Sequence, residues 1–206
     1  MNPYNAEEYS KYMVYKEKIK SYIEREIEIL KLLDVAAIDA AMNMIQTAFE
    51  AEKTIYIFGN GGSAATASHY VNDFNKGISE YTEKKFHFAC LNDNFATVMA
   101  IANDIGYEEV FRFQLRGRLA EGDLVIAISG SGNSKNVINA VQLAKERGNK
   151  VIGLTGYSGG LLKPLADVSL HVPIDDMQIT EDIHMVFDHL MMSVFMSALG
   201  KGSTEK

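Results

Sequence analysis

The 206-residue sequence contains one cysteine, three prolines and no tryptophan. A single thiol cannot form an internal disulfide, so we expect a reducing compartment, the cytoplasm. Because prolines are few and no segment has low complexity, nothing marks a linker, and residues 1–206 are expected to form a single domain. No apolar run reaches the roughly 18 residues that cross a membrane, and the polar N-terminus shows no export signal. We therefore expect no membrane association.

Positive charge is also scarce. The chain has 20 lysines and arginines against 27 aspartates and glutamates, which gives a net charge of −7. With no basic run to offset this balance, we do not expect a general nucleic-acid-binding surface. The 47% hydrophobic content is ordinary for a globular protein.

Uncharged apolar segments alternate with segments of helical periodicity. Strands are expected at 54–58, 86–91, 124–128, 150–155 and 168–172, and helices at 63–76, 94–102, 107–119, 135–147 and 179–199. Continuous rather than alternating hydrophobicity is typical of parallel strands that are covered on both faces. The pattern predicts an α/β fold, a three-layer α/β/α sandwich with a five-stranded parallel sheet, and 2-1-3-4-5 is its simplest doubly wound order.

Two further helices are expected before the first strand, over 6–32 and 36–51, with Asp34 or Asp39 as the cap of the second. The first has an apolar stripe formed by Tyr9, Met13, Ile19, Tyr22, Ile23, Ile27 and Leu30. This stripe is explained equally well as a cover for the sheet or as an oligomer interface.

The first strand leads directly into the loop Gly59-Asn60-Gly61-Gly62-Ser63, and a helix of small residues follows. Glycines let the backbone approach a ligand closely, and the free N–H groups of a helix start attract anions. The segment therefore predicts a phosphate site.

A second small polar loop, Ser129 to Ser134, separates strand 124–128 from helix 135–147. Its serine hydroxyls and free amides can hold a phosphate without any lysine, and Thr155-Gly156 is a weaker third element. A Walker A loop is excluded because no Lys-Ser/Thr pair follows the glycines. A dinucleotide site remains an alternative, but the acidic residue that it needs is not at the expected distance.

His69 and Asp73 are four residues apart and share a face of the helix that follows the first loop. On the last helix, Glu181 and His189 are slightly more than two turns apart. If the two helices converge, these four side chains form a site for a divalent metal such as zinc. His184 on the last helix is expected to have only a structural role.

Several of these segments resemble one family. Phe58-Gly59-Asn60-Gly61-Gly62-Ser63-Ala64-Ala65, together with His69, is similar to the first signature of the sugar isomerase (SIS) domain family, in its phosphoheptose isomerase branch. Residues 100–111 and 128–134 match further blocks, and the similarity extends from about residue 35 to 199. The resemblance implies a homotetramer with active sites shared between subunits, in which the helical segment 1–52 helps assembly.

The resemblance also assigns roles to residues. The phosphate-binding serines of the family correspond to Ser63, Ser129, Ser131 and Ser134, the asparagine that contacts substrate corresponds to Asn60 beside Gly61, and the metal-binding and catalytic histidines correspond to His69 and His189. The chain departs from the family where Asp73 replaces the glutamate base, Glu181 a metal-binding glutamine, Gly77 an arginine and Asn94 an acidic substrate contact.

The expected function is isomerisation of a phosphorylated aldose and ketose, sedoheptulose 7-phosphate or a close relative. Asp73 would be the general base and His189 the general acid, with a divalent metal, zinc, bound by His69, Asp73, Glu181 and His189. Substrate contacts are expected from Asn60, Gly61, Ser63, Asn94, Ser129, Ser131 and Ser134. The alternative is a SIS protein without catalysis that binds a phosphosugar or another protein.

Overall fold

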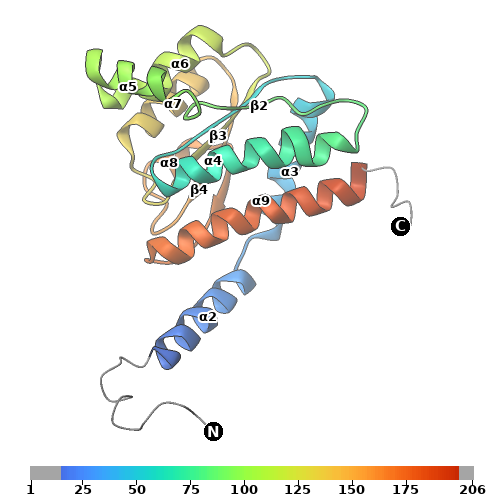
Figure 1. Cartoon of the computed structure of the whole chain (residues 1–206), viewed down its shortest axis with the longest axis vertical. Coiled ribbons are helices and arrows are strands. Elements are labelled where there is room, and N and C mark those ends of the chain that lie inside the picture. The colour runs from blue at the N-terminus through green and yellow to red at the C-terminus, as the bar shows by residue number, and fades with distance from the viewer. Residues whose placement is uncertain (1–14, 200–206) are drawn as a thin grey trace, which may run out of the picture. The chain divides into compact units, whose positions relative to one another are not determined.

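A computed structural model describes residues 15–199 (Figure 1). The chain divides into two compact units, one up to Leu32 and one from Leu33 onward. In the first unit, helix α2 spans Lys16–Lys31. Residues 6–14 of the helix expected over 6–32 lie outside the described residues.

The second unit alternates strands and helices. Its strands are β1 (Ile55–Phe58), β2 (Phe88–Cys90), β3 (Leu124–Ser129), β4 (Lys150–Thr155) and β5 (Val168–His171). Its α-helices are α3 (Val35–Glu50), α4 (Gly62–Asn72), α5 (Phe95–Asp104), α6 (Val110–Arg118), α7 (Lys135–Glu146), α8 (Leu162–Leu165) and α9 (Met177–Leu199).

All five strands are parallel and lie in the order β2-β1-β3-β4-β5. This confirms the five-stranded sheet and the strand order expected from the sequence. Every residue of β1 and of β3 is buried. Burial on both faces explains why these strands are hydrophobic throughout, without alternation.

Helices cover both faces of the sheet. On one face, α6, α7 and α8 share a core with β1, β3 and β4, in which Phe58 stacks on Phe111 with ring centroids 4.8 Å apart. The other face is covered by α3, α4 and α9, and α4 and α9 lie side by side (Figure 1). The three-layer sandwich is therefore confirmed.

Some boundaries differ from the expected ones. The helix expected over 63–76 ends as an α-helix at Asn72 and continues as a π-helical turn, Asp73–Gly77, and a 3-10 turn, Ile78–Glu80. A 3-10 turn, Tyr107–Glu109, precedes α6. Helix α8 lies in a segment expected to be a loop, because four residues are too short to show a hydrophobic period.

Side-chain caps fix two helix starts. Asp34, rather than Asp39, caps α3 by accepting hydrogen bonds from the amides of Ala36 and Ala37. Asn94 caps α5 by accepting one from the amide of Thr97 at 3.0 Å. Within residues 15–199, no helix is both long and apolar enough to cross a membrane.

Phe74 is the centre of an aromatic cluster between α4 and α9. Its ring contacts those of Tyr70, Phe86, Phe88 and Phe195, with centroid separations of 4.4 to 6.0 Å. The side chain is fully buried. The cluster therefore joins the start of the π-helical turn to the last helix.

We expect Phe74→Ala to lower the free energy of unfolding by about 3–5 kcal/mol, because it removes a buried ring and leaves a cavity. Urea denaturation followed by circular dichroism measures this loss. Tyr81→Ala is the matched control, since Tyr81 is exposed, and it should change the free energy little. Equal effects of the two substitutions would contradict the role given to the cluster.

Candidate active site

Two polar loops meet at the carboxyl edge of the sheet. The chain leaves β1 toward β2 on one side, whereas β3 lies on the other side of β1. The point where the strand order reverses in this way is where ligands bind in open α/β sheets. The loops after β1 and after β3 flank this point.

The first loop depends on Gly61, whose φ is +55° at the N-cap of α4. This conformation is strained for residues that have a Cβ atom. Ser63 is buried in the first turn of α4. The loop thus places a hydroxyl and free amides at a helix start, as expected for an anion site.

The second loop is held together by its own hydroxyls. Ser129 Oγ donates to Ser134 Oγ at 3.0 Å, and Ser131 Oγ accepts from the amide of Asn133 at 3.2 Å. Gly132 has φ +68°, and a Cβ there would lie 2.9 Å from the amide nitrogen of Gly160. The loop therefore packs against the segment after β4, and its hydroxyls gather in front of α7.

Asn60 joins the first loop to the start of α7. Its side chain exchanges two hydrogen bonds of 2.9 Å with that of Asn136, and its Oδ1 also accepts from the Tyr107 hydroxyl at 2.8 Å. A pocket of about 310 Å³ opens beside this network, lined by Asn60, Tyr107, Glu108, Ser134, Lys135 and Asn136. Lys135 gives this pocket a positive charge next to the second loop, Ser129 to Ser134, which we call the serine loop.

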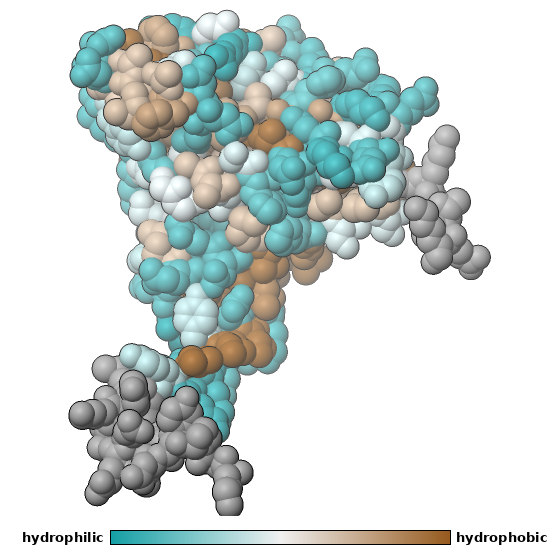
Figure 2. Space-filling view, in the orientation of Figure 1, coloured by the Kyte–Doolittle hydropathy of each residue, from teal (hydrophilic) through white to brown (hydrophobic). Residues whose placement is uncertain are grey.

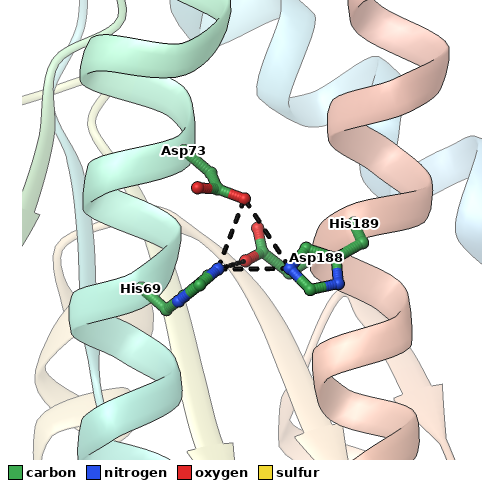
Figure 3. Close-up of side chains that lie close together, drawn as sticks. All are labelled: His69, Asp73, Asp188 and His189. Atoms are coloured by element: carbon green, nitrogen blue, oxygen red, sulfur yellow. Dashed lines mark hydrogen bonds and ion pairs between the residues drawn. The ribbon is translucent and has the colours of Figure 1, made fainter.

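The second part of the site lies between α4 and α9, where four side chains point toward one another (Figure 3). His69 Nε2 lies 3.2 Å from His189 Nε2 and 3.5 Å from Asp73 Oδ2. His69 Nε2 to Asp188 Oδ2, and His189 Nε2 to Asp73 Oδ2, both measure 3.9 Å. One ligand atom from each of the four residues lies within 4.8 Å of every other.

This group combines buried carboxyls with accessible imidazoles. The side chains of His69 and His189 are 42% and 59% exposed, whereas that of Asp188 is fully buried. Asp73 Oδ1 accepts a hydrogen bond from Nδ2 of the Asn72 side chain at 3.0 Å, which leaves Oδ2 directed at the histidines. Burial raises the pKa of Asp188 to about 8, and the negative charge of Asp73 adds to the shift.

The donor set fits a divalent cation. Two imidazole nitrogens and two carboxylates are ligands that zinc and neighbouring transition metals accept. Both oxygens of Asp188 are buried and have no hydrogen-bond partner within residues 15–199. A buried carboxylate in this position is stabilised by a metal or an ion pair.

The structure brings together His69, Asp73 and His189 of the four metal ligands predicted from the sequence. Glu181 is not part of this group. Its carboxylate lies against the start of α4, where a Cβ added at Gly62 would be 2.6 Å from Oε2 of Glu181. Asn94, a predicted substrate contact, is exposed and caps α5.

Four residues around the site were not selected from the sequence. They are Asp188, Lys135, Tyr107 and Asn136. Lys135 directly follows the serine loop, and this position was a usable signal. Tyr107 and Asn136 reach the site through tertiary contacts with Asn60 that no local pattern encodes.

Comparison with known proteins gives consistent matches. A family model described as the SIS domain matches residues 15–156. A phosphoheptose isomerase of Helicobacter pylori is 36% identical over 180 residues, which cover 87% of this chain and 89% of the relative. A probable phosphoheptose isomerase of Thermoplasma acidophilum is 36% identical over 175 residues, covering 85% and 96%.

A solved structure agrees with these matches. The phosphoheptose isomerase of Neisseria gonorrhoeae superposes with a TM-score of 0.82 at 30% identity, over 89% of this chain and all of that chain. The likeness includes the sheet and its helical layers, because it covers most of the described residues.

One turn before Asp188 on α9, His184 is buried, and neither ring nitrogen has a hydrogen-bond partner within residues 15–199. Burial lowers the pKa of His184 from 6.5 to about 4. The backbone of Thr155 lies near enough to offset part of this shift without reaching hydrogen-bond geometry. His184 is therefore neutral in the folded protein at pH 7.

The lowered pKa of His184 predicts that the folded protein becomes less stable at acidic pH. Between pH 6.5 and 4 only the unfolded chain protonates this imidazole, so the stability due to neutral His184 is complete above pH 6.5 and decreases as the pH falls. We expect the free energy of unfolding to decrease by about 3 kcal/mol more in the wild type than in His184→Phe between pH 7 and pH 4. Denaturant unfolding at several pH values measures the difference. His87→Phe, at an exposed position, should follow the wild type, and equal slopes in all three proteins would contradict the assignment.

Proposed function

Because the chain belongs to the SIS domain family, in its phosphoheptose isomerase branch, we propose that it isomerises sedoheptulose 7-phosphate or a closely related ketose phosphate to the aldose. The observation that carries the proposal is the group of His69, Asp73, Asp188 and His189, with both imidazoles accessible beside buried carboxyls. Aldose–ketose isomerisation requires such paired acid and base groups.

We expect the serine loop to bind the phosphate group of the substrate. Ser129, Ser131 and Ser134 provide hydroxyls in front of α7, and Lys135 adds a positive charge. Glu181 places a negative charge at the start of α4, so the second loop attracts phosphate more strongly than the first. Asn60, Gly61 and Ser63 then face the sugar.

The reacting end lies further along α4. His69 is seven residues beyond Gly62, which corresponds to roughly 10 Å along a helix. Both loops lie at the edge from which α4 starts, so an extended sugar phosphate can have its phosphate at the loops and its carbonyl near His69. Asn94 Oδ1 accepts a hydrogen bond from the Thr97 amide at the start of α5. We expect Asn94 to contact the substrate only when this hydrogen bond is broken.

Asp73 and His189 would move the protons. Asp73 takes the proton from C1 of the ketose and returns it to C2, while His189 transfers a proton between the oxygens of the same two carbons. The enediol formed after the first step is the only intermediate required. The two side chains lie close together, with Asp73 Oδ2 3.9 Å from His189 Nε2, so both residues can act on neighbouring atoms of one substrate, each through an atom that does not bind the metal.

His69, Asp73 and His189 would hold a divalent metal, zinc, together with a further oxygen ligand from α9. When bound, such a metal polarises the substrate carbonyl and stabilises negative charge on its oxygen. The exposure of the two imidazoles leaves one side of the group open to a ligand.

We further propose a cytoplasmic homotetramer in which α2 contributes to assembly. Ile19, Ile23, Ile27 and Leu30 are between 39% and 56% exposed, and their spacing places them on one face of α2. Apolar side chains are visible along α2 in Figure 2. An exposed stripe of this kind is stabilised by burial against another subunit.

Ile23→Glu should weaken the assembly, because it places a charge in the apolar stripe. Sedimentation equilibrium is expected to show a tetramer for the wild type and smaller species for the variant. Ser21→Glu introduces the same charge on the opposite, exposed side of α2 and should leave the mass unchanged. A tetramer that resists Ile23→Glu would remove α2 from the interface.

Isomerisation is tested by proton and phosphorus NMR of sedoheptulose 7-phosphate in D₂O with zinc-loaded protein. We expect an aldose phosphate to appear with deuterium at C2, since the proton transferred by the base exchanges with solvent. Asp73→Asn should lower the rate by about 10²–10⁴-fold, the usual contribution of a general base.

Asp182→Asn makes the same substitution on α9 outside the group and should retain the wild-type rate. Full turnover by Asp73→Asn would show that another residue is the base. Binding of the sugar phosphate, seen as line broadening, without any conversion would favour a different ketose phosphate or the non-catalytic SIS protein.

A further inference from the structure

Asp188 is unusual among the carboxylates of this protein. It is fully buried, and neither of its oxygens has a hydrogen-bond partner within residues 15–199. Leaving a carboxylate without a partner in the interior is costly, so such groups are normally paired or bound to a metal. No lysine or arginine side chain forms an ion pair with Asp188 in the described part of the chain.

The side chain points into the group between α4 and α9 (Figure 3). Asp188 Oδ2 lies 3.9 Å from His69 Nε2, and its ligand atom is within 4.8 Å of those of Asp73 and His189. The two buried oxygens are therefore directed at the other polar atoms of the group rather than at the hydrophobic core.

The separations match those of a tetrahedral metal site. Bonds of 2.0–2.1 Å to zinc place neighbouring ligand atoms about 3.3 Å apart. The four distances of the group that involve a histidine nitrogen and are given above range from 3.2 to 3.9 Å. Only small movements are needed to bring all four atoms to one cation.

Glu181 is placed less well for the same role. It precedes His189 by eight residues, which corresponds to a rise of about 12 Å along one helix. Its carboxylate lies at Gly62, the first residue of α4. There it faces the N-terminal end of the helix, where negative charge is favourable.

We propose that Asp188 is the fourth ligand of the metal, so that one chain binds a divalent cation through His69, Asp73, Asp188 and His189. This inference rests on the metal-dependent isomerase proposed above and deepens it. Two carboxylates balance the charge of a dication, and the mixed nitrogen and oxygen set suits zinc. Glu181 remains at the loops, where it faces the substrate.

The test measures metal binding rather than activity. Zinc affinity is determined by competition with a chromophoric chelator, and cobalt(II) absorption reports four-coordinate geometry. Asp188→Asn is expected to weaken zinc binding by about a hundredfold or more, because even partners outside the ligand set cost 10–100-fold. The cobalt spectrum of this variant should lose its intense four-coordinate bands.

Asp188→Leu replaces the carboxylate with an apolar group of the same branching and should show the same loss, and a cooperative unfolding transition shows that each variant is folded. Glu181→Gln and Asp182→Asn are matched controls on α9, and both should retain wild-type affinity. The inference is overturned if Asp188→Asn and Asp188→Leu bind zinc like the wild type, if Glu181→Gln alone loses the metal, or if the wild type binds none.

The NMR assay distinguishes a failure of the ligand assignment from a failure of the proposed function. If the wild type converts the ketose phosphate while both Asp188 variants keep their zinc, only the ligand assignment fails. If zinc is bound through Asp188 and no ketose phosphate is converted, the ligand assignment holds and the proposed function fails.

Discussion

The site depends on the close approach of α4 and α9, which run in the same direction. Gly62 lies against Glu181 near the start of both helices, where a Cβ would collide with the carboxylate, and Phe74 packs on Phe195 near their ends. Between these contacts, His69 and His189 come within 3.2 Å although 120 residues separate them in sequence. A longer distance between the helices would separate His69 and Asp73 from Asp188 and His189 and break up the group.

Helix α9 also connects the group of His69, Asp73, Asp188 and His189 to the loops after β3 and β4. Near the start of α9, Met177 and Thr180 fill the space beside Gly130 and Gly156, where a Cβ at either glycine would collide with them. The loops after β3 and β4 therefore pack directly on α9. Because α9 contacts the loops at one end and contributes Asp188 and His189 about three turns later, one rigid element would position both ends of the proposed substrate.

Much of the architecture could be predicted from the sequence because burial on both faces makes each strand a continuous apolar run. The π-helical turn at Asp73 could not, since no hydrophobic period distinguishes it from a continuing α-helix. His69 and Asp73 could be paired because their spacing is local. The position of Asp188 could not, because adjacent residues point about 100° apart on a helix, and the rotation of α9 about its axis decides which of them reach the group.

The two carboxylates of the group, Asp73 and Asp188, lie close enough for the charge of one to affect the other. Aspartate at 73 retracts a carboxylate by roughly 1.5 Å relative to glutamate, and Asp188 supplies a second carboxylate beside it. Asp73 and Asp188 repel each other when both are charged, which is the second cause of the raised pKa of Asp188. A bound dication would relieve this repulsion, so the two carboxylates together favour metal binding.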